Sequence, residues 1–82
     1  MEKLTNQVIK IIAKELDIPK KLITWGTSIQ EDLGADSLDV INIIMALENK
    51  FNIEIDGDTV HQFNTVADIV DAITLVIVPE RN

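Results

Sequence analysis

Apolar residues recur at helical spacing in three separate segments, and no other feature of this 82-residue sequence restricts its fold as strongly. The segments are 3–16, about 37–51, and a last one that begins at Thr65 and stops at Pro79. Residues three and four positions apart share one face of a helix, so each segment predicts an amphipathic helix with one side toward a core. The β-branched residues within 73–78 leave a strand open as an alternative there, although the chain offers no evident pairing partner.

Two connections separate the predicted helices, and the first is unusually long. It covers the 20 residues 17–36, more than a domain of this size normally leaves without structure. We therefore expect its apolar residues to fold back onto the core, with a helical turn on the way and with Trp25 as an anchor. These apolar residues are Ile18, Leu22, Ile23, Ile29 and Leu33. The second connection, 52–64, has room for a short helix at about 57–63.

The pattern as a whole predicts an all-α fold. We expect a small four-helix bundle with three main helices, a short third helix and a long loop between the first two. Eighty-two residues allow one domain with one small core, here 1–82, and are too few for a doubly wound nucleotide fold or a barrel enzyme. The absence of cysteine excludes a disulfide scaffold and a thiol nucleophile, so apolar packing alone must stabilise the fold.

The charge balance narrows the choice of partners. Fourteen aspartate and glutamate residues stand against seven lysine and arginine residues, which gives a formal net charge of −7. This charge argues against nucleic acid, whose phosphates need a basic patch, and favours protein partners with basic patches. The amino terminus has no apolar targeting segment, and no stretch reaches the roughly 20 apolar residues of a membrane span. We therefore expect a cytoplasmic monomer without a membrane span.

The second predicted helix carries more apolar surface than one core contact uses. Five apolar residues form a stripe suited to the core, namely Val40, Ile43, Ile44, Leu47 and Phe51. Leu38, Ile41 and Met45 lie on a neighbouring arc, which Glu48 borders. Two interpretations remain open. Either the long loop covers this second arc, or the arc is an exposed patch for protein partners.

The start of the same helix has the marks of a site. Gly34 permits a turn, and Asp36 and Asp39 have the spacing of a capping box. Ser37 then falls in the first helical turn, where free backbone N–H groups and the positive end of the helix dipole stabilise a phosphate. By position alone, Ser37 is either a site for a phosphate ester or only a first-turn residue.

A wider match favours the phosphate ester. The run Asp32–Asp39, DLGADSLD, resembles the prosthetic-group attachment motif of the acyl carrier proteins. The resemblance continues through Met45-Ala46-Leu47-Glu48, Phe51 and 53–55, and it covers essentially the whole chain. It implies a four-helix fold and a protein that is not an enzyme but carries acyl intermediates as thioesters.

The resemblance also implies roles for single residues. Ser37 would receive 4′-phosphopantetheine from coenzyme A through a phosphodiester on its hydroxyl. Asp36 would matter to the phosphopantetheinyl transferase that loads this arm. The partner-docking surface for acyl-handling synthase enzymes would consist of Leu38, Asp39, Ile41, Met45 and Glu48.

Departures from the family pattern leave the pathway open. Asn42 stands where an acidic residue is usual, Lys50 lightens the charge at the end of the helix, and 56–63 is less acidic than expected. The alternatives to fatty-acid synthesis are a specialised polyketide or lipid pathway and an aminoacyl pathway. A further alternative, from a different class, is a helical interaction module that is never modified.

Two other readings of the motifs are weaker. Asp36-Ser37-Leu38 is similar to an esterase motif, but the chain is too short for a hydrolase and His61 is the only histidine. We expect His61 on the surface of the short helix. The acidic residues of 54–58 do not form an EF-hand loop, because the spacing of their glycine and of the last ligand is wrong. No metal site is predicted.

Overall fold

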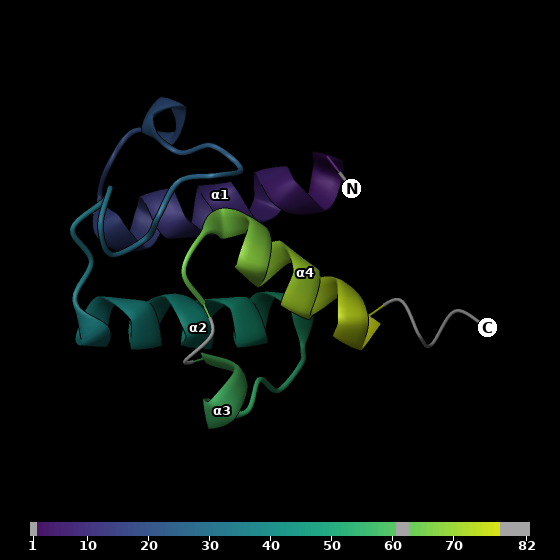
Figure 1. The fold of residues 1–82 in the computed structure, drawn as a ribbon. Coiled ribbons are helices and arrows are strands. Elements are labelled where there is room, and N and C mark those ends of the chain that lie inside the picture. The colour runs from purple at the N-terminus through teal and green to yellow at the C-terminus, as the bar shows by residue number, and fades with distance from the viewer. Residues whose placement is uncertain (1, 61–62, 78–82) are drawn as a thin grey trace.

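The computed structural model describes residues 2–60 and 63–77, and it is helical throughout its regular elements. The helices are α1 (Glu2–Leu16), the 3₁₀ turn η1 (Lys20–Leu22), α2 (Ser37–Phe51), α3 (Gly57–Val60) and α4 (Val66–Ile77) (Figure 1). The predicted all-α architecture, with three main helices and a short third one, is confirmed. The alternative of a strand at the end of the chain is wrong for 73–77, because α4 continues to Ile77.

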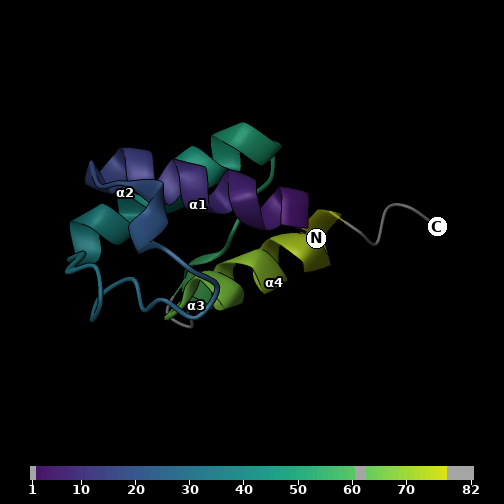
Figure 2. The same cartoon turned by 90° about the horizontal axis from the view of Figure 1, so that it is seen from above.

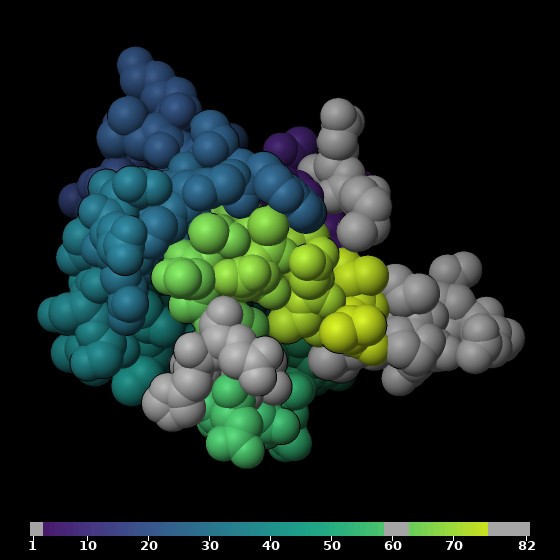
Figure 3. All heavy atoms as spheres, in the orientation of Figure 1, coloured from purple at the N-terminus to yellow at the C-terminus, as the bar shows by residue number. Residues whose placement is uncertain are grey.

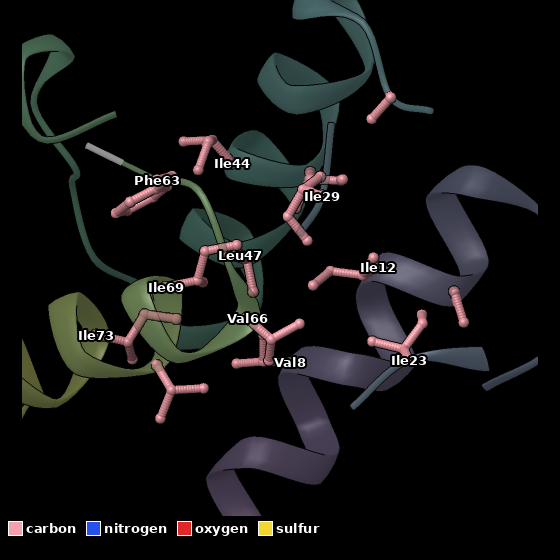
Figure 4. Packing of buried hydrophobic residues seen from close by; sticks show 14 residues of the cluster. Val8, Ile12, Ile23, Ile29, Ile44, Leu47, Phe63, Val66, Ile69 and Ile73 are labelled. Carbon is pink, nitrogen blue, oxygen red and sulfur yellow. The ribbon is translucent and has the colours of Figure 1, made fainter. Parts of the chain in front are cut away.

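The core forms where the three long helices meet. α1 packs against both α2 and α4, and it runs beside them in both ribbon views (Figure 1 and Figure 2). The residues with no measurable exposure come from all three helices: Val8 and Ile12, then Leu47, then Val66, Val70 and Ile73 (Figure 4). Because every buried side chain of this set is aliphatic, the core provides packing and no chemistry.

α1 and α2 end in the same way. Asp17 and Asn52 each follow the last helical residue and adopt positive φ, 58° and 56°. The next residue is an isoleucine in both cases. Ile18 N donates to Ala13 O at 3.0 Å and Ile53 N donates to Glu48 O at 3.1 Å. These bonds close the last turn of each helix, and each isoleucine packs against the core as the chain departs.

The long loop folds back onto the core, as predicted, but with a different selection of side chains. Ile23 and Ile29 are buried, and η1 supplies the expected helical turn. Leu22, however, is 56% exposed, so the expectation that it packs inward is wrong, and the Trp25 side chain is 48% exposed. Ile23 takes the inward position at the end of η1, which turns Leu22 to the surface.

Backbone hydrogen bonds attach this loop to the start of α4. Val66 N donates to Thr27 O at 3.1 Å, and Ala67 N donates to Trp25 O at 3.0 Å. Ile29 N donates to Asn64 O at 2.9 Å just beyond. The first N–H groups of a helix have no partner within it, so the loop completes α4. The Trp25 carbonyl therefore provides one of these attachments.

The start of α4 is also capped from within its own sequence. Asp68 N donates to Thr65 Oγ1 at 3.3 Å, and Thr65 N donates to Asp68 Oδ2 at 3.1 Å, which confirms the predicted acid three residues after Thr65. α4 is the helix richest in apolar residues, and it is 12 residues long. No helix in the described ranges has the length and apolar character to cross a membrane.

Candidate functional site

A tight turn delivers the chain to the start of α2. Ser28 N donates to Asp32 Oδ2 at 2.8 Å, and Glu31 N donates to Ser28 Oγ at 3.1 Å. Gly34 then adopts φ +73°, a conformation that a side chain disfavours. Ala35 follows, buried with 6% exposure. The small buried side chain of Ala35 holds the backbone against the core, so the next residues emerge at the surface.

The two carboxylates around the serine form the predicted capping box. Asp39 N donates to Asp36 Oδ1 at 2.9 Å, and Asp36 N donates to Asp39 Oδ2 at 3.2 Å. Both carboxylates are therefore occupied in holding the first turn of α2. Their hydrogen bonds fix the backbone on either side of Ser37 without contacting its hydroxyl.

Ser37 itself is exposed at the first position of α2. Its hydroxyl makes no hydrogen bond within residues 2–60 and 63–77. The first intrahelical bond of α2 runs from Val40 N to Asp36 O at 3.0 Å, so the N–H groups of Ser37 and Leu38 precede the ladder and have no helical acceptor. The geometry thus offers a free hydroxyl beside two free backbone donors, which fits a phosphate ester on this oxygen.

The second apolar arc of α2 is open to solvent. Leu38 is 64% exposed, Ile41 50% and Met45 58%. The long loop does not cover them, so the interpretation that it would is wrong. The opposite stripe behaves as predicted, with Ile43, Ile44 and Leu47 buried in the core and Val40 and Phe51 packed against it. We call Leu38, Ile41 and Met45 the apolar patch.

Glu48 makes a contact that no sequence pattern predicts. The side chain is half-buried, and its Oε2 accepts a hydrogen bond from Ile55 N at 2.8 Å. The Glu48 carbonyl also accepts a hydrogen bond from Ile53 N, so Glu48 binds two backbone N–H groups of the segment that follows α2. The two residues of this bond are seven positions apart with a left-handed residue between them, and no known sequence pattern has that spacing. The bond could therefore not be predicted from the sequence.

The remaining candidates gain no support as sites. No group of three potential metal ligands comes together within the part of the chain that the structure describes. Glu54, before α3, and Asp58, in its first turn, are exposed. The prediction for His61 falls on residues 61–62, outside the described ranges. The helix expected at about 57–63 does not include Phe63, which is buried but not helical.

Comparison with known proteins agrees with the geometry. The family described as "Phosphopantetheine attachment site" matches residues 6–73. An acyl carrier protein of Syntrophobacter fumaroxidans is 43% identical over 65 residues, which are 79% of this chain and 80% of the relative. The match begins within α1, includes the long loop, α2 and α3, and extends into α4. The chain therefore belongs to the acyl carrier proteins, the carriers whose prosthetic group is phosphopantetheine.

Proposed function

We propose that Ser37 is the residue to which the phosphopantetheine arm is attached. The chain has two serines, and the structure gives them different environments. Ser28 is half-buried, and its Oγ accepts the bond from Glu31 N inside the turn. Ser37 is exposed, and its hydroxyl is free within the described residues. The free hydroxyl at the start of α2 is the observation on which the proposal depends.

The chemistry at Ser37 follows from what the chain has and lacks. In the loading reaction Ser37 Oγ loses its proton and bonds to the pantetheine phosphorus of coenzyme A, while adenosine 3′,5′-bisphosphate leaves. The N–H groups of Ser37 and Leu38 are positioned to donate to phosphate oxygens on this ester. The bound arm supplies a thiol, which this cysteine-free chain cannot supply, and the thiol holds acyl groups as thioesters.

The protein acts in this proposal as a carrier and not as an enzyme. Asp36 and Asp39 are engaged with backbone N–H groups, so neither is placed to remove a proton from Ser37. The proton is taken by the transferase, for which Asp36 is a contact. The whole chain, 1–82, is one carrier domain, active as a monomer in the cytoplasm.

The partner surface begins directly beside the attachment point. The apolar patch lies on the exposed side of α2 that follows Ser37, with Asp39 at its start and Glu48 near its end. Phosphopantetheinyl transferase and acyl-handling synthases would approach with basic patches and bury the exposed apolar side chains at close range. The pathway proposed is fatty-acid synthesis; a specialised polyketide or lipid pathway would use the same surface.

Intact-mass measurement tests the attachment site. Purified protein is incubated with coenzyme A and a broad-specificity phosphopantetheinyl transferase, and the modified residue is mapped by fragmentation. We expect one phosphopantetheine increment on the natural chain and on Ser28→Ala, and none on Ser37→Ala. An increment on Ser37→Ala would show that the site is elsewhere. No increment on a folded natural chain, with the transferase active on a control carrier, would favour the unmodified interaction module.

A further inference from the structure

The lysines of this acidic protein lie on the outer face of α1 and on the two elements that flank it. The sequence contains six lysines, and all six are exposed. Lys3, Lys10 and Lys14 are spaced by seven and four positions along α1, so they share its outer face. None of the six ammonium groups forms an ion pair within the described ranges. Lysines without a carboxylate partner in the protein itself are available to bind an external anion.

The other three lysines extend this face on both sides of α1. Asn6 and Ile9 border a shallow groove of about 390 Å³ whose remaining lining comes from the loop, with Lys20, Lys21 and Ile23. On the opposite side of the helix, a groove of about 320 Å³ runs between α1 and α2. It is lined by Ile11, Lys14, Glu15, Ala46, Asn49 and Lys50. We call the six lysines, 3, 10, 14, 20, 21 and 50, the basic face.

The basic face is separate from the apolar patch. Ala46 and Lys50 lie on the flank of α2 that borders α1. Helical spacing places Leu38, Ile41 and Met45 on another flank, well away from those two positions. Lys50 shares its flank of α2 with Asp39, so a partner that also covers Asp39 would approach this end of the basic face, whereas the lysines of α1 and η1 would stay accessible.

Two exposed apolar side chains follow the lysines of η1 along the chain, and the second belongs to the residue whose carbonyl accepts from Ala67 N at the start of α4. Lys20 and Lys21 are followed by Leu22, 56% exposed, and by Trp25, 48% exposed. The segment around η1 stands out from the body of the molecule at the top of the space-filling view (Figure 3). Tryptophan and lysine both combine an apolar body with a polar end, which suits them to the boundary between water and lipid.

We propose that the basic face, together with Leu22 and Trp25, binds the surface of an anionic lipid bilayer. Lysine is a point charge without the bidentate geometry of arginine. Several lysines therefore suit the diffuse negative charge of lipid headgroups better than they suit a single, geometrically defined acidic pocket on a protein. Leu22 and Trp25 project outward and would enter the headgroup region, whereas a protein partner would need a matching cavity. The association is peripheral and reversible.

The net charge of −7 does not prevent this contact. Glu2 and Glu15 in α1 and Asp17 just after it lie among these lysines along the chain, and six lysines outnumber the three acids. Most other acids belong to the loop end, α2, α3 and α4. The molecule measures 37 × 26 × 20 Å, and charges farther than about 8 Å from the bilayer are largely screened at physiological ionic strength.

Vesicle binding tests the proposal with a probe that the chain already contains. Trp25 is the only tryptophan and tyrosine is absent, so tryptophan emission reports on this one position. With phosphatidylglycerol vesicles at low salt we expect co-sedimentation and a blue shift of the emission, both absent with phosphatidylcholine vesicles. Adding salt to about 0.5 M should release the protein, because the attraction is screened.

Charge-matched variants separate the basic face from net charge. Lys20→Gln with Lys21→Gln should weaken binding by roughly tenfold or more. Gln30→Glu with Asn42→Asp changes the net charge by the same amount at exposed positions outside the basic face, and it should change affinity by far less. All four positions are exposed, and circular dichroism confirms that each variant is folded.

Three results would overturn the proposal. They are no binding to anionic vesicles at low salt, equal losses in the two double variants, and binding to poly-glutamate without binding to vesicles. The last result would assign the basic face to an acidic protein. Ser37→Ala should bind vesicles as the natural chain does, so a failure of loading and a failure of lipid binding remain distinguishable.

Discussion

At the scale of single residues, the capping box fixes the backbone around Ser37 while its two carboxylates leave the Ser37 hydroxyl without a contact. Asp36 and Asp39 each accept a hydrogen bond from the other's backbone N–H, and the hydroxyl between them stays free. Glu48 does comparable work at the other end of α2 by accepting from Ile55 N. Carboxylates that the sequence suggests as docking charges therefore also hold the ends of the helix.

Substitution of Asp36 separates its two roles. Asp36→Ala removes the N-cap acceptor and should lower the free energy of unfolding by about 1 kcal/mol, measured by urea denaturation. Asp36→Asn keeps an acceptor oxygen and should unfold nearly as the natural chain does, since asparagine caps equally well. If Asp36→Asn is stable but receives phosphopantetheine slowly, the transferase recognises the negative charge of the Asp36 carboxylate. Equal stability of the alanine variant would contradict the capping role.

Glu48 permits a similar dissection. Glu48→Ala leaves Ile55 N–H without its acceptor, and we expect a loss of about 1–2 kcal/mol together with faster hydrogen exchange at the Ile55 amide. Glu48→Gln retains an acceptor and removes the charge, so stability should hold while affinity for a basic partner falls at low salt. Unchanged exchange at Ile55 in the alanine variant would show that the bond does not form in solution.

At the scale of elements, the long loop is a structural part and not a spacer. Its backbone accepts the first N–H groups of α4 at Thr27 O and Trp25 O, while Ile23 and Ile29 enter the core. The same loop ends in the turn at Gly34 that places Ser37 on the surface. The position of the attachment site therefore depends on α4 through the loop, although Ser37 belongs to α2.

The glycines of the loop provide a matched test of the turn. Neither Gly34 nor Gly26 has an atom within 4 Å of an added Cβ, so the two differ in backbone conformation and not in space. Gly34→Ala should cost about 1 kcal/mol, because φ of +73° disfavours a side chain. Gly26→Ala should leave the midpoint of thermal unfolding unchanged or slightly raised. Equal melting temperatures in the two variants would contradict the strained turn.

At the scale of the whole molecule, three helices share one aliphatic core, and no cysteine reinforces it. Native domains are stabilised by only about 5–15 kcal/mol, so a single large core side chain accounts for much of the total. Residues on the outer face of a helix can therefore be substituted without much loss of stability only where they contribute little to that core.

Two substitutions on α2 test this division. Leu47 has no exposure, and Leu47→Ala should destabilise the protein by about 2–5 kcal/mol, because it leaves a cavity. Met45 is 58% exposed, and Met45→Ala should stay within about 0.5 kcal/mol of the natural chain. Denaturant titration measures both. A large loss in Met45→Ala would show that the apolar patch serves the fold and not partners.

Much of this fold could be predicted because its signals are local. Helical spacing located α1, α2 and α4, and the acids three residues after Asp36 and Thr65 marked two helix starts. The loop was harder. Its apolar residues are not periodic, so nothing in the sequence shows that Ile23 turns inward while Leu22 and Trp25 turn outward.

Local sequence patterns predict which segments are helical, where two of the helices begin and which serine follows a glycine turn, because each of these depends on neighbours within a few positions. Only the packed fold shows that the apolar patch is uncovered, that Glu48 holds Ile55, and that lysines of η1 and α2 line grooves on the two flanks of α1. These relations join residues far apart in the chain. They are set by how the helices and the loop pack around one core, and local spacing carries no record of that packing.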